Sequence, residues 1–97
     1  MALCADLGEV RTNIDRLDEQ IATLLAERSR YVAEAARFKP TEDAVVVPER
    51  VEAVVAHART VAERQGAEPG LLEAIYRPMV AAFIAFERTE WRRLHAS

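Results

Sequence analysis

Two charged side chains stand where the pattern of this sequence predicts apolar ones. Through the first third of the chain, apolar residues recur three and four positions apart, the a/d pattern of a helix that packs along a seam. They are Leu7, Val10, Ile14, Leu17, Ile21, Leu24, Tyr31 and Ala35. Arg28 occupies the next a position. A guanidinium on a buried seam keeps its charge, so a carboxylate of the protein or of a ligand must lie against it.

The second misplaced charge is Glu87, which falls within an apolar stripe near the end of the chain. The other members of that stripe are Leu72, Tyr76, Val80, Phe83, Trp91 and Leu94. We therefore expect the Glu87 carboxyl to point into the protein. There it can donate a hydrogen bond only while it is protonated.

These charges have two interpretations. In one, Glu87 and Arg28 form a buried salt bridge, which specifies register more than it stabilises. Further cations lie at helix ends or beside the seam, namely Arg11, Lys39 and Arg50. One glutamate cannot neutralise all of them. A dianionic small molecule can, because arginine binds carboxylates in bidentate fashion.

Helices must position these groups. A capping pair, Asp6 and Glu9, predicts a first helix over about 7–38 that Pro40 ends. Residues 40–47 hold a proline and acids without helical period, so they are expected to form a loop. That loop is either a lid over a substrate or a plain connector.

Two further helices follow. Pro48 suits a first helical position and Gly66 a left-handed C-terminal one, which predicts a second helix over about 48–65. A third is expected over about 69–95, with a local kink at Pro78. His57, His95, Tyr31 and Trp91 are taken as ordinary solvated or core residues, and the arginines Arg88, Arg92 and Arg93 as partners of the helix dipole.

The fold class expected is all-α, with residues 1–97 forming a single domain. A first helix of roughly 30 residues is about 45 Å long, which overshoots a compact monomer of this length with its radius of gyration of about 12 to 13 Å. A second copy must then cover the apolar seam. We therefore expect an intertwined homodimeric helical bundle.

The composition of the chain limits the kinds of partner and site that it is expected to have. Hydrophobic residues make up 51% of the chain and charged residues 30%, with a net charge of -3, which disfavours nucleic acid as a partner. No run approaches the roughly 20 apolar residues of a membrane span, so no membrane segment is expected. Cys4 is alone, and His57 and His95 are far apart, so neither a disulfide nor a metal site is expected. These features favour a cytoplasmic enzyme.

The order and spacing of the charged residues resemble those of the all-helical chorismate mutase family across nearly the whole chain. The residues that carry the resemblance are Arg11, Arg28, Lys39, Arg50 and Glu87. Within the family, the stretch RYVAEAARFKPTEDAVVVPERV looks most like the isochorismate pyruvate lyases of salicylate and siderophore biosynthesis. The resemblance implies a pericyclic enzyme without cofactor or metal that acts on isochorismate or chorismate.

The resemblance also implies roles for individual residues. Arg28 and Arg11 would bind the two substrate carboxylates, with Arg11 completing the site of the other chain in the dimer. Lys39 would bind the ether oxygen of the enolpyruvyl group and a carboxylate, and Arg50 would lie near the ring. Glu87 stands where most bacterial relatives carry a glutamine that donates to the ether oxygen.

Three positions depart from typical mutases. Val47 and Val51 stand where an aspartate and a glutamate handle the ring hydroxyl, and Phe83 replaces a small hydroxyl residue. A pocket lined by these residues suits the lyase better than the mutase. Mutases of chorismate or of amino-deoxychorismate remain alternatives, as does a non-catalytic dimerisation or regulatory module, although such a module has no reason to keep the four cations.

Overall fold

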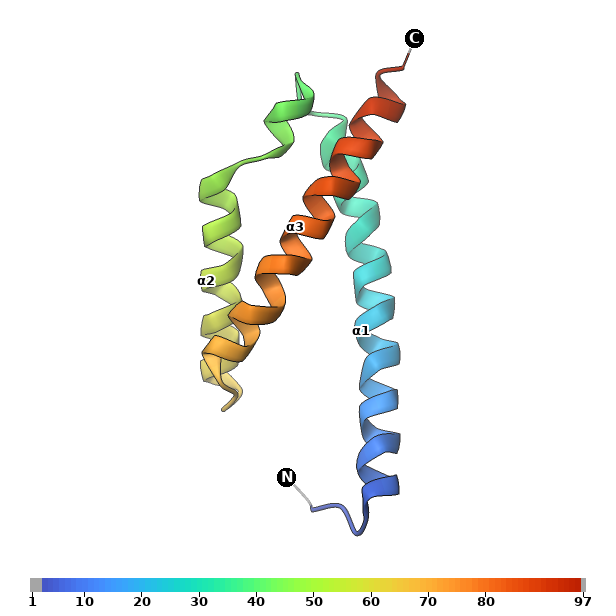
Figure 1. Ribbon diagram of the computed structural model, residues 1–97, viewed down its shortest axis with the longest axis vertical. Helices are drawn as coiled ribbons and strands as arrows, with labels where there is room; N and C mark the ends of the chain where they lie inside the picture. The colour runs from blue at the N-terminus through green and yellow to red at the C-terminus, as the bar shows by residue number, and fades with distance from the viewer. Residues whose placement is uncertain (1–2, 97) are drawn as a thin grey trace. The chain divides into compact units, whose positions relative to one another are not determined.

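The computed structural model describes residues 3–96, which are helical and contain no strand (Figure 1). The elements are α1 (Leu7–Ala36), the 3₁₀ helix η1 (Glu42–Val45), α2 (Pro48–Arg64) and α3 (Pro69–Leu94). The prediction of an all-α chain with a long first helix is confirmed. The chain forms two compact units, one reaching to Tyr31 and the other beginning at Val32.

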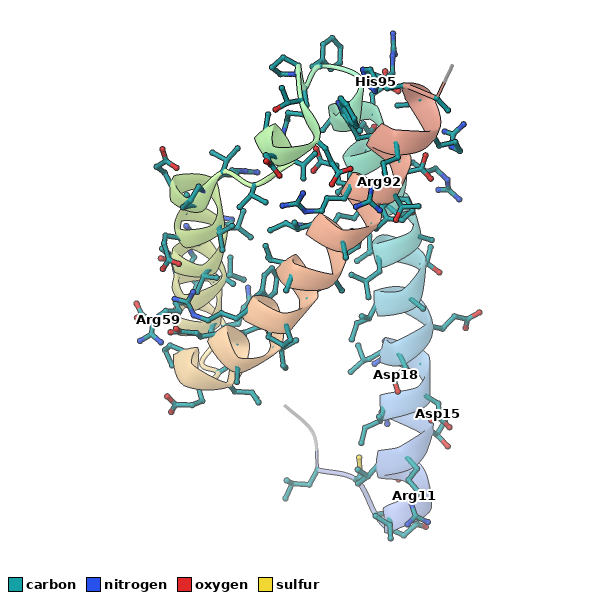
Figure 2. All side chains as sticks on the ribbon, turned by 45° about the horizontal axis from the view of Figure 1, so that its top comes forward. Arg11, Asp15, Asp18, Arg59, Arg92 and His95 are labelled. Atoms are coloured by element: carbon teal, nitrogen blue, oxygen red, sulfur yellow. The ribbon has the colours of Figure 1, made fainter. Side chains whose placement is uncertain are left out.

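The first unit is an amphipathic helix. Its seam residues are exposed, among them Leu7 at 60% and Leu24 at 63%. Polar side chains such as Arg11, Asp15 and Asp18 also project from α1 (Figure 2). An isolated helix cannot bury its own apolar stripe. Helices are stabilised mainly by packing that stripe against other elements.

The ends of α1 follow from local hydrogen bonds. The Glu9 N–H donates to Asp6 Oδ1 at 2.8 Å and the Ala5 N–H donates to Glu9 Oε2 at 3.0 Å, which confirms the predicted capping pair. The helix ends at Ala36 and not near Phe38. Beyond Ala36, the N–H groups of 37–39 bond to carbonyls three residues back, which tightens the chain, and a residue before proline is disfavoured in helical geometry.

The segment 40–47 is not wholly a loop, because η1 lies within it. Thr41 Oγ1 accepts a hydrogen bond from the Ala44 N–H at 3.3 Å, and the Val46 N–H donates to the Asp43 carbonyl at 3.1 Å. A threonine cap followed by acidic residues favours such a turn. Val45 is 4% exposed, so the turn is fastened to the core of the second unit.

A Schellman turn joins α2 to α3. Gly66 has φ 70°, the Ala67 N–H donates to the Ala62 carbonyl at 2.8 Å, and the Gly66 N–H donates to the Glu63 carbonyl at 3.2 Å. This confirms the predicted left-handed glycine. The two helices leave the turn side by side (Figure 1) and bury small residues, including Val55 and Val80.

Helix α3 differs from the expectation that no stretch is apolar enough for a membrane. By length and composition alone, α3 is long and apolar enough to cross a membrane. A single helix that passes this test does not establish a membrane span, because core helices pass it too. Its first half carries Glu73 and Arg77, which form ion pairs with each other and with Arg59 and Glu52 of α2. Charged pairs of this kind suit a helix that packs against protein.

Candidate active site

The second unit brings Lys39 and Glu87 together. Lys39 follows the end of α1, and Glu87 lies on α3. The distance from Lys39 Nζ to Glu87 Oε2 is 3.2 Å, and the two side chains are 24% and 9% exposed. The prediction that Glu87 points inward is confirmed, and Lys39 is a cation that lies beside it.

The hydrogen bonding of this pair is incomplete. Within residues 3–96, Glu87 Oε2 is buried and takes part in no hydrogen bond, although it lies within ion-pair distance of Lys39. Lys39 Nζ also reaches the Ala44 carbonyl oxygen at 3.5 Å, the limit of a hydrogen bond. The ammonium therefore meets this oxygen as an ion-pair partner without a well-aligned hydrogen bond.

The backbone of Lys39 is held by α3 as well. Trp91 Nε1 donates to the Lys39 carbonyl oxygen at 3.0 Å. The imidazole of His95 stacks on the Trp91 ring with 4.0 Å between ring centroids. Trp91 therefore has a polar tertiary contact, which the interpretation as an ordinary core residue did not include.

An ion-pair cluster, consisting of Glu42, Asp43, Arg88 and Arg92, joins η1 to α3. Arg88 Nη1 donates to Glu42 Oε2 at 3.0 Å and to Asp43 Oδ1 at 3.1 Å, and Arg92 Nη2 donates to Glu42 Oε2 at 2.9 Å. The hydrogen bond from Arg92 is the main reason that the pKa of Glu42 is lowered, with Arg88 adding to the effect. Figure 2 shows Arg92 near the end of α3.

Comparison with known proteins identifies the family. The family described as "Chorismate mutase type II" matches residues 10–88. The chain belongs to this family. It is 34% identical to an isochorismate pyruvate lyase of Pseudomonas aeruginosa over 90 residues, 93% of this chain and 89% of that protein. It is also 36% identical to a T-protein of Enterobacter agglomerans over 76 residues, 77% of this chain but 20% of the T-protein.

Membership of the type II chorismate mutase family indicates that the chain is an enzyme.

The second unit places three more of the expected site residues at the start of α2. Val47 is the N-cap residue, and its carbonyl accepts the N–H groups of Arg50 at 3.0 Å and Val51 at 3.1 Å. Arg50 is exposed and Val51 is half-buried. These residues therefore share the first turn of α2.

The remaining expected residues of this chorismate mutase family member lie on α1 and α3. Phe83 is half-buried on α3, one turn before Glu87. Arg11 and Arg28 belong to the first unit, where Arg11 is exposed and Arg28 is half-buried. Among residues 3–96, no group of three or more histidine, cysteine, aspartate or glutamate side chains is arranged to hold a metal ion.

The ion-pair cluster was missed because its arginines were assigned to the helix dipole. One sequence signal for it exists: Arg88 and Arg92 are four residues apart and so share a face of α3, and Glu42 and Asp43 are adjacent acids on the segment that must return toward that helix. The structure pairs these groups and thereby fixes the segment that follows Lys39.

The cluster makes a pH-dependent contribution to stability. Because the pKa of Glu42 is lower in the folded chain than its usual value of 4.5, its contribution is present above that value and is lost as the pH falls through the folded pKa. We expect Glu42→Gln to lower the melting temperature at pH 7, and the difference from the wild type to shrink below about pH 4.5.

Thermal melts from neutral to acidic pH measure this difference. Glu63→Gln, on an exposed turn of α2, is the matched control and should leave the melting temperature nearly unchanged. A gap between Glu42→Gln and wild type that stays constant with pH would contradict the contribution assigned to the Glu42 carboxylate.

Proposed function

We propose that this chain is an isochorismate pyruvate lyase, which converts isochorismate to salicylate and pyruvate. The observation that carries the proposal is the convergence of Lys39 Nζ and Glu87 Oε2 at 3.2 Å. An ammonium and a protonated carboxyl at that point supply two hydrogen-bond donors for one ligand oxygen. The relative from Pseudomonas aeruginosa is named isochorismate pyruvate lyase, which supports this assignment.

The reaction suits a site of this kind because it is pericyclic. The bond between the ring carbon and the ether oxygen breaks while a ring hydrogen moves to the methylene carbon of the enolpyruvyl group, so pyruvate leaves and the ring becomes aromatic. Negative charge gathers on the ether oxygen as its bond to the ring breaks. Lys39 and protonated Glu87 would stabilise that charge, and the arginines would hold the reactive conformer.

The proposal that the substrate is a dicarboxylate rests on the cationic side chains of the site. Arg28 and Arg11 would bind the two carboxylates, with Arg50 near the ring. We further propose a homodimer in which Arg11 completes the site of the other chain. The exposed seam of α1 supports a second copy as the partner, because an uncovered apolar stripe promotes association. The lone cysteine fits a cytoplasmic location.

Three apolar residues favour the lyase over the mutase. Val47 and Val51 flank the start of α2, and Phe83 lies one turn before Glu87. None of these side chains can hydrogen-bond the ring hydroxyl of chorismate as the acidic residues of typical mutases would, whereas isochorismate carries its hydroxyl on a different ring carbon. The lyase creates an aromatic ring and needs no rearrangement of the side chain onto the ring.

Incubation of the purified chain with isochorismate, and separately with chorismate, tests the proposal. We expect salicylate fluorescence and pyruvate from isochorismate with slow chorismate turnover. Prephenate from chorismate without salicylate would overturn the lyase in favour of a chorismate mutase. That second function is favoured by the family description. An enzyme active on amino-deoxychorismate alone would overturn both.

The donor role of Glu87 predicts how two substitutions differ. An amide presents an N–H donor where the carboxyl stood, so Glu87→Gln should retain most of the wild-type kcat. Glu87→Leu has no donor, and we expect its kcat to fall by about 100-fold to 1,000-fold, the range for loss of one donor to a developing oxyanion.

The measurement is the steady-state kcat of the wild type and of both variants at neutral pH. Glu90→Gln is a matched control on the same helix, where Glu90 pairs with Arg93 instead of Lys39. It should keep the wild-type kcat. Equal losses in Glu87→Gln and Glu87→Leu would show that Glu87 is not the donor.

A further inference from the structure

One helix face holds Lys39 at two points. Glu87 and Trp91 are four residues apart on α3, so their side chains project on the same side of the helix. The Glu87 carboxyl contacts the Lys39 ammonium at 3.2 Å, and the Trp91 indole N–H contacts the Lys39 carbonyl oxygen at 3.0 Å. Contacts from α3 thus hold both the side chain and the carbonyl group of Lys39.

The Lys39 peptide needs such support because it lies beyond the end of α1. Its N–H reaches the Ala36 carbonyl at 3.3 Å, longer than a usual N–H to O bond. The next residue, Pro40, has no N–H to give to the chain around it. The indole hydrogen bond therefore anchors a peptide whose helical bonding has already weakened.

The indole is itself held in place. His95 stacks on it at 4.0 Å with 17° between the ring planes, and His95 Nδ1 lies 2.8 Å from the Trp91 carbonyl oxygen. Figure 2 shows His95 at the end of α3. A ring packed in this way has few rotamers, so the position of its N–H is well defined.

We propose that Trp91 is a positioning residue of the active site, which directs the Lys39 ammonium by holding the Lys39 carbonyl. Its effect on the rate rests on the proposed function, whereas its effect on the order of Lys39 does not. Losing one hydrogen bond of this kind should lower kcat by about fivefold to tenfold, with KM changed less than about twofold.

The chain contains one tryptophan and one lysine, so labelling by amino acid gives one signal from each. Wild-type full-length protein with ¹⁵N in the indole and ¹³C in the lysine carbonyl is the first sample. Solid-state NMR is expected to show a dipolar coupling between the two labels. Absence of that coupling would overturn the contact on which the proposal depends.

The second sample is Trp91→Phe, which keeps an aromatic ring and removes the N–H. Its Lys39 ¹³Cε signal should relax like that of a more mobile side chain, and its kcat should show the loss given above. Thr89→Val is the matched control, since it removes another α3 side-chain donor, the bond from Thr89 Oγ1 to the Ala85 carbonyl. It should change neither the relaxation of the Lys39 signal nor kcat.

Unchanged Lys39 relaxation in folded Trp91→Phe would overturn the proposal, as would equal changes in Thr89→Val. If the wild type turns over neither isochorismate nor chorismate, the proposed function fails, and the relaxation of Lys39 still decides the role of Trp91. If Trp91→Phe lowers kcat but leaves the Lys39 signal as in the wild type, Trp91 acts by another route and the positioning role is wrong.

Discussion

Replacing Lys39 with alanine is expected to lower kcat by about 100-fold to 1,000-fold, the range for loss of one group that stabilises charge in a transition state. Lys39 is the cation that meets Glu87 at 3.2 Å, where the proposed reaction gathers charge on the ether oxygen. KM should change less than kcat, because the interaction grows as the bond breaks. Steady-state kinetics with isochorismate measure both.

The alanine variant alone leaves the buried Glu87 carboxyl without its partner, and a buried polar group left unsatisfied costs about 1 to 3 kcal/mol of stability. The double variant Lys39→Ala with Glu87→Gln removes the ammonium and replaces the carboxyl with an amide, and it is the control. It should regain the thermal stability lost in Lys39→Ala and remain as inactive. A double variant with wild-type kcat would contradict the catalytic role of Lys39.

Features set by neighbouring residues could be predicted from the sequence. The cap at Asp6 and Glu9, the left-handed Gly66 and the inward direction of Glu87 each follow from residue type and helical spacing. Helix periodicity tells which way a side chain faces on its own helix. It does not tell which residue of another segment meets it, so before the structure only the family resemblance, through a shared ether oxygen, related Lys39 to Glu87.

Features that depend on distant or very short segments could not be predicted. The 3₁₀ turn over 42–45 is shorter than any period that reveals a helix, so sequence pattern does not distinguish it from a loop. The bond from Trp91 to Lys39 joins residues 52 positions apart. No spacing rule reaches that far, and an apolar ring on an apolar stripe gives no sign that its N–H has a partner.

Mixing two inactive variants is expected to restore activity if each site takes Arg11 from the other chain. Arg11→Ala spoils the site that receives Arg11, and Lys39→Ala spoils the site of its own chain. Each mixed dimer then has one site with both defects and one intact site. Random pairing makes half of the dimers mixed, so refolding the variants together should recover about a quarter of wild-type activity.

This result separates two arrangements that predict the same single-variant losses. If Arg11 serves its own chain, each site of a mixed dimer carries one defect, and mixing restores nothing. Arg50→Ala mixed with Lys39→Ala is the control, because both residues are proposed to line the same chain's site, and no activity should return. Recovery requires a stable dimer, and the exposed seam of α1, with Leu7 60% and Leu24 63% accessible, gives the second chain a surface to cover.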